Sequence, residues 1–108
     1  MILTTTNSIE NHKIVDYLGI VTGISYNSSH SYEGKKMSFK DMFSMKKYYE
    51  VYAKGLEKIK EEAFQKLRDN AKGLGSNAVV GIQIDIETLA TTNTLIVSIT
   101  GTAVKVAV

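Results

Sequence analysis

The chain has 108 residues, of which 44% are hydrophobic and 22% charged, as is typical of one globular domain spanning residues 1–108. A formal net charge of +2 is too small to indicate nucleic acid or a membrane surface as a partner. Because cysteine is absent, disulfides, iron–sulfur clusters, zinc fingers and thiol nucleophiles are excluded. Residues 1–6 contain no basic group and no apolar run approaches a membrane span, so we expect a cytoplasmic protein without a signal peptide.

The first clear element is a long strand over residues 14–26, which are rich in β-branched and aromatic side chains. Both of its faces are apolar or small, whereas a strand with one solvated face would alternate more cleanly. We expect a short strand over residues 2–5 to pair with it across the polar turn at residues 7–11. The face expected to remain uncovered by the helix carries Val15, Tyr17, Gly19, Val21 and Gly23.

A long helix is predicted from Lys46 to Leu74, because apolar residues recur there every three or four positions. The opposite side is charged, and Glu62 and Lys66 have the favourable i, i+4 order. Gly73 or Gly75 is expected to end this helix. Before it, residues 27–36 are predicted to form a loop and Ser38 to cap a short helix. The apolar stripe of the long helix consists of Tyr49, Tyr52, Leu56, Ile59, Ala63, Leu67, Ala71 and Leu74.

Two further strands are predicted at the end of the chain, over residues 78–87 and 95–108. In the last strand the apolar parity changes between Ile99 and Val104, which predicts a β-bulge at Gly101. The order β, β, α, β, β predicts an α+β two-layer sandwich, with one antiparallel sheet and one long helix across it. The face of the third strand expected to pack on the helix consists of Ala78, Val80, Ile82, Ile84 and Ile86.

This architecture leaves one apolar sheet face without a covering layer. Soluble monomers rarely expose a large apolar patch, so we expect this face to be buried between copies of the same chain. The sequence therefore predicts a homo-oligomer before any relationship to other proteins is considered.

Three blocks of sequence, residues 14–23, 71–82 and 97–104, resemble the YbjQ-like family, which carries the label "putative heavy-metal-binding domain". The resemblance covers nearly the whole chain, and residues 52–81 follow the family pattern without a gap. It implies a small α+β fold like a dodecin subunit, assembled as a ring-like homo-oligomer, a pentamer. The chain departs from the family pattern between Ser28 and Lys47, so any role of that segment elsewhere does not transfer to this chain.

The family label suggests metal binding, and two carboxylates of this chain suit a hard cation in place of a soft heavy metal. A soft heavy metal prefers thiolates, which this chain lacks, and His12 and His30 share no motif. Asp85 and Glu87 alternate along one strand and so point to the same face. Cyclic symmetry would bring several copies of this pair near one axis, which would suit a hard divalent cation. The alternative is that the acids are merely solvated on a polar strand face, or are paired with Lys105 on the neighbouring strand.

Other chemistry has weaker support from the residues. Met37, Met42 and Met45 near His30 could form a thioether site for Cu(I), but such methionines usually pack a core. No nucleophile with a base, zinc-protease motif or phosphate loop appears, so we expect no enzyme and no catalytic residue. Residues 35–72 carry 11 of the 13 basic groups. The alternative function is therefore an interaction module whose oligomer binds a protein or anionic partner.

Overall fold

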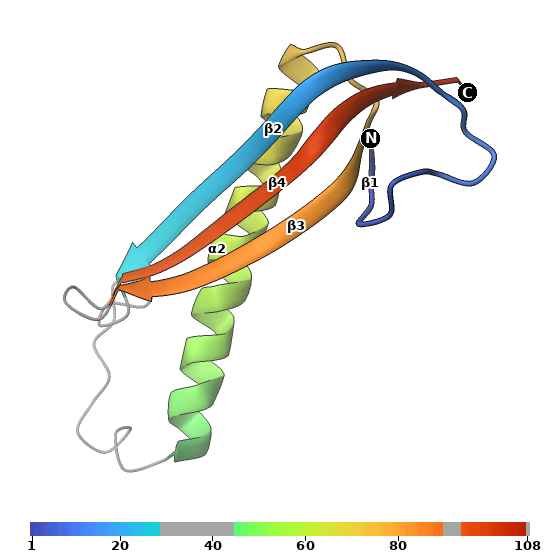
Figure 1. The fold of residues 1–108 in the computed structure, drawn as a ribbon. Coiled ribbons are helices and arrows are strands. Elements are labelled where there is room, and N and C mark those ends of the chain that lie inside the picture. The colour runs from blue at the N-terminus through green and yellow to red at the C-terminus, as the bar shows by residue number, and fades with distance from the viewer. Residues whose placement is uncertain (29–44, 90–93, 108) are drawn as a thin grey trace.

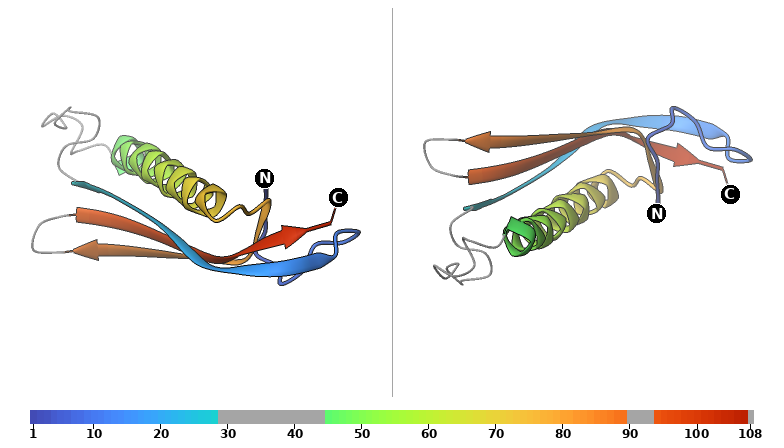
Figure 2. Two further views of the ribbon diagram at one scale, coloured as in Figure 1. Left: turned by 90° about the horizontal axis from the view of Figure 1, so that it is seen from above. Right: turned by 90° about the horizontal axis from the view of Figure 1, so that it is seen from below.

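The computed structural model describes residues 1–28, 45–89 and 94–107. It contains strands β1 (Ile2–Leu3) and β2 (Ile14–Ser28), helix α2 (Met45–Gly73), and strands β3 (Ala78–Leu89) and β4 (Thr94–Val106). The strands form one sheet in the order β1-β3-β4-β2 (Figure 1). Two further views show that α2 lies on one side of the sheet only (Figure 2). The predicted α+β class, with one long helix across a sheet, is confirmed for the described residues.

The sheet is mixed and not antiparallel as predicted. β1 pairs in parallel with β3, where Ile2 lies opposite Ala78, whereas we had expected it to pair with β2. β4 pairs antiparallel with both β2 and β3, so the last strand of the chain is central in the sheet. The partner of β1 could not be predicted because a two-residue strand carries no apolar pattern of its own. The chain between β1 and β2 is also long enough to cross the sheet, so the two strands need not be neighbours.

Helix α2 matches its predicted range to within one residue at each end. It stops as expected at the glycines: Ser76 N donates to Ala71 O at 3.1 Å, and Gly75 N donates to Lys72 O at 2.9 Å. These are the two hydrogen bonds of a Schellman motif, with Gly75 at a φ of 80°. The predicted short helix after Ser38 lies outside the described residues, as does most of the Ser28–Lys47 segment.

The main core lies between α2 and the sheet strands β2 and β4. The helix contributes four fully buried side chains at a spacing of four, Ile59, Ala63, Leu67 and Ala71. Facing them are Val21, Val97 and Ile99, and Gly23 is also buried against the helix. The prediction that Val21 and Gly23 lie on the uncovered sheet face is therefore wrong.

The error in the face of β2 has a physical cause in the sheet register. The pairing of β2 with β4 shifts by one residue between Tyr17 and Gly19, so the side-chain parity of β2 reverses there. The sheet face away from α2 carries four exposed apolar residues, Tyr17, Ile20, Ile24 and Tyr26. The expectation of an uncovered apolar face is thus confirmed in this subunit, although three of the residues assigned to it, Gly19, Val21 and Gly23, lie on the α2 side instead.

The bulge predicted at Gly101 in β4 is also wrong, because the register shifts lie in the neighbouring strands. β3 carries one extra residue between Val80 and Gln83, where Gly81 has a φ of 61° that L side chains rarely adopt. β4 itself has no extra residue. Its buried apolar residues lie on the α2 side as far as Ala103 and on the other sheet face at Val104 and Val106. Its last residues join a second small cluster on the other sheet face, made by Ala78, Val80, Val104 and Val106 with Ile9 and Ile14.

The same shift divides the apolar face that was predicted for β3. Ala78 and Val80 belong to the second cluster, whereas Ile82 packs in the main core. Ile84 and Ile86 are 44% and 45% exposed, because α2 lies over β2 and β4 and does not reach β3 at this point. Ile84 lies on the α2 side of the sheet, opposite Ile99, but the prediction that it packs against the helix stripe is wrong.

Candidate functional site

Asp85 and Glu87 lie on the same sheet face, as predicted from their spacing. In the register of β3 with β4, Asp85 is opposite Ser98 and Glu87 is opposite Ile96, on the face away from α2. Both side chains are exposed. Within residues 1–28, 45–89 and 94–107, neither carboxylate forms an ion pair or a hydrogen bond.

Pairing of these acids with Lys105 within one subunit is excluded by the register. Lys105 lies opposite Asp16 of β2, seven positions along β4 from Ser98. At about 3.3 Å per residue this is a separation of roughly 23 Å, far beyond the reach of an ion pair. The two acids are therefore solvated in the isolated subunit.

The described residues of one subunit do not fit a heavy-metal site. They contain no group of three or more histidine, aspartate or glutamate side chains that could hold an ion. His12 Nδ1 is 3.2 Å from Ala107 O, at the opposite end of β4 from the two acids. His30, Met37 and Met42 lie outside the described residues. Asp85 and Glu87 supply oxygen ligands for at most part of the coordination shell of a hard cation, which takes six to eight oxygens.

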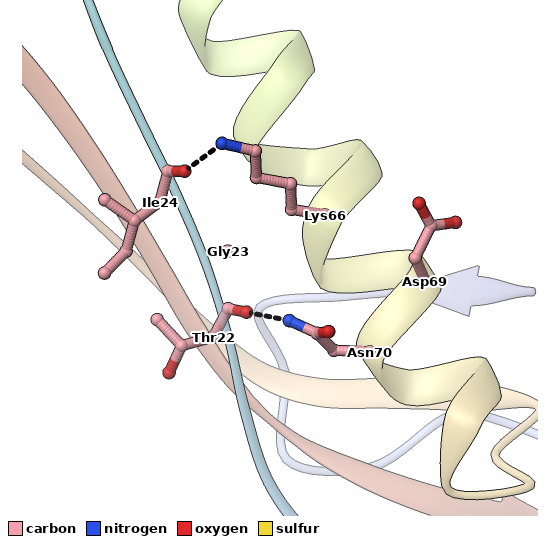
Figure 3. Close-up of a pocket in the computed structure, with 6 residues that line it drawn as sticks. All are labelled: Thr22, Gly23, Ile24, Lys66, Asp69 and Asn70. Carbon is pink, nitrogen blue, oxygen red and sulfur yellow. Dashed lines mark hydrogen bonds between the residues drawn. The ribbon is translucent and has the colours of Figure 1, made fainter.

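A shallow groove of about 430 Å³ runs between β2 and α2 and was not predicted from the sequence (Figure 3). Its lining includes two side chains that bind the backbone of β2. Lys66 Nζ donates to Ile24 O at 2.8 Å, and Asn70 Nδ2 donates to Thr22 O at 2.7 Å. Nearby, Ser25 Oγ donates to Glu62 Oε2 at 2.8 Å.

These bonds make Glu62, Lys66 and Asn70 a polar row along one side of α2 that fastens the helix to β2. The i, i+4 spacing was visible in the sequence, but it suggested a pair between Glu62 and Lys66 along the helix. In the structure both side chains turn to β2 instead. The donors in the groove are already used by the chain itself, so the groove offers few free groups to a ligand.

The residues of the block 71–82 also serve the fold. Ser76, which is buried, donates its hydroxyl to Ala78 O at 2.6 Å or Val104 O at 3.0 Å. Asn77 pairs with the backbone of Val106 on both sides: its Oδ1 accepts from Val106 N at 2.8 Å, and its Nδ2 donates to Val106 O at 3.0 Å. This block therefore joins the helix end to β4 and brings no reactive group to the surface.

Comparison with known proteins identifies the family of the chain. A family model of the YbjQ-like proteins, with the description "Putative heavy-metal-binding", matches residues 1–107. The chain belongs to the YbjQ-like family.

A solved structure similar to this YbjQ-like chain is the crystal structure of a protein of unknown function of the DUF74 family from Pediococcus pentosaceus. The two are 18% identical with a TM-score of 0.61, and the match covers 99% of this chain and 98% of the other. At this identity the likeness shows the fold alone. In the part of this YbjQ-like chain that the structure describes, no helix is both long and apolar enough to cross a membrane.

Proposed function

We propose that the chain is a non-enzymatic, cytoplasmic homo-oligomeric protein that holds a metal ion or other small ligand between its subunits. One observation carries the proposal: the sheet face away from α2 remains apolar and exposed in a single subunit. Its side chains Tyr17, Ile20 and Tyr26 are 69%, 77% and 71% exposed. Such a surface is typical of a protein–protein interface.

The shape of the subunit supports the same proposal. Its radius of gyration is 17.3 Å, against about 13 Å for a compact domain of this length. A long sheet with one helix buries less of its own apolar surface than a compact domain does. Packing against other copies would supply the missing burial.

Ligand binding rests on the family description together with the position of the acids. One subunit offers Asp85 and Glu87 as exposed neighbours on one face, and its described residues add no third ligand to them. A cation site therefore requires acids from several copies, arranged by the symmetry of the assembly. The chemistry of such a site is carboxylate oxygen, which suits hard divalent cations better than soft heavy metals.

The assembly is tested by light scattering at micromolar concentration. We expect the ring of five implied by the family resemblance, with a mass of about 60 kDa, five times the 11.9 kDa of the subunit. A mass near that of one subunit would contradict the proposal.

The cation site is tested by thermal melts with calcium, zinc or copper. If a cation neutralises the acids, it raises the melting temperature, adding about 2.7 kcal/mol of stability when free metal is 100 times its Kd. The double change Asp85→Asn with Glu87→Gln should abolish this effect. The control change Glu57→Gln with Asp69→Asn, which removes two exposed acids from α2, should retain it. No shift in the unchanged protein would remove the metal site and favour the interaction module.

A further inference from the structure

Strands β2 and β3 each have one half whose outer edge is closed by the chain itself and one half whose outer edge no described residue pairs with. On β3 the closed half is the beginning, where β1 and the residues after it add a parallel strand. Thr4 N donates to Val79 O at 3.0 Å, Ile82 N to Thr4 O at 3.1 Å, and Gly81 N to Thr6 O at 2.8 Å. From Gln83 to Leu89, no described residue pairs with the outer edge of β3. We call residues 83–89 the free half of β3.

On β2 the closed half is the end of the strand. The row of Lys66 and Asn70 occupies the carbonyls of Ile24 and Thr22, which an edge strand otherwise leaves open. The helix ends near Gly19, where a Cβ would lie 3.9 Å from Leu74 Cδ1. Before that point β4 is the only described element that pairs with β2. We call residues 14–20 the free half of β2.

The two free halves lie on opposite edges and at opposite ends of the sheet (Figure 1). β2 and β3 run in the same direction, because both are antiparallel to β4. A second copy, placed so that the helices stay on one side of the joined sheet, can therefore set its β2 beside the first copy's β3 in parallel. Because the free halves lie at opposite ends of the sheet, the two copies must be offset along the strand direction. With this offset only the free halves meet, and neither closed half is part of the contact.

The side chains of the two free halves are compatible on each sheet face. On the face away from α2, exposed apolar residues lie on both halves: Leu89 on β3, and Tyr17 and Ile20 on β2. Asp85 and Glu87 of β3 also lie on this face, whereas the exposed acid of the free half of β2, Asp16, lies opposite Lys105 on the α2 side, so the acids of the two halves do not meet. Two copies of the same half would instead bring like charges of β3 together.

We infer that copies of this chain assemble head to tail, with residues 83–89 of one subunit pairing in parallel with residues 14–20 of the next. The inference rests on the proposed homo-oligomer and specifies its interface. Such a heterologous contact uses a different surface on each side, so it closes into a ring when the rotation between subunits permits. It also covers the edges of both free halves, which are otherwise sites of uncontrolled association.

Cross-linking tests the interface directly, because the chain has no cysteine of its own. The variants Tyr17→Cys and Glu87→Cys replace exposed residues of the two free halves that lie on the same sheet face. After co-refolding, a short bis-maleimide should link them into dimers in the mixture and in neither variant alone. A chain carrying both changes should give a ladder of linked subunits. The control Ile24→Cys, half exposed on the closed half of β2, should not link to Glu87→Cys.

The outcomes distinguish the interface from the assembly. Dimers in Glu87→Cys alone would show a symmetric β3–β3 contact and overturn the head-to-tail inference. Equal linking of Ile24→Cys would overturn it as well. An oligomer in light scattering that gives no link between Tyr17→Cys and Glu87→Cys would overturn the interface and leave the homo-oligomer standing. A monomer in light scattering would overturn both.

Discussion

Replacing Gly23 with alanine should lower the free energy of unfolding by about 3 kcal/mol or more, a large part of the stability of a domain. A Cβ built at Gly23 would overlap the backbone of α2, lying 2.7 Å from Leu67 N and against Ala63 O. A side chain could rotate away, but backbone atoms of a helix can make room only if the helix moves. That movement would also disturb the bonds from Lys66 and Asn70 to β2.

Denaturant melts at a fixed protein concentration measure this effect, and Gly73→Ala is the matched control. Gly73 is the last residue of α2, and a Cβ there would meet nothing within 4 Å. Because alanine favours the helix by up to about 1 kcal/mol over glycine, this control should be neutral or stabilising. Similar losses in both variants would mean that α2 does not approach β2 at Gly23.

Leu67→Ala should cost about 2–5 kcal/mol in the free energy of unfolding. Leu67 is completely buried in the middle of the core-facing side of α2. Its removal loses the transfer energy of the buried methyl groups and leaves a cavity that a helix held against two strands cannot easily fill.

The control for this second experiment is Leu74→Ala, at the end of the same helix. Leu74 is 45% exposed, so its truncation should cost less than about 1 kcal/mol in the same denaturant melts. If the two leucines proved equally important, the assignment of the buried face of α2 would be wrong.

The helix was predictable because its apolar spacing is strong and its end is marked by Gly75. The faces of the strands were harder. β2 is apolar on both sides, so a single register shift near Leu18 reversed the side on which Val21 and Gly23 lie without leaving a visible trace in the pattern. Likewise, the shift at Gly81 divided a face of β3 that looks continuous in the sequence.

The candidate site was predictable only in part. The period of two placed Asp85 and Glu87 on one sheet face, and the structure agrees. Their distance from Lys105 depends on the register of two strands, which no local pattern states. The polar row of α2 was misassigned because i, i+4 spacing cannot tell a pair along the helix from two separate bonds to a neighbouring strand.

The central position of β4 has a consequence for how the chain acquires its fold. β2 and β3 both pair with β4, and β4 follows both of them in the chain, so it leaves the ribosome after them. A nascent chain that ends before residue 94 can form α2 but has no strand to join β2 to β3. Many domains begin to fold from their N-terminus during synthesis. Here β2 and β3 can be joined only after β4 has been synthesised, and until then α2 is the described element that can cover the apolar strand β2.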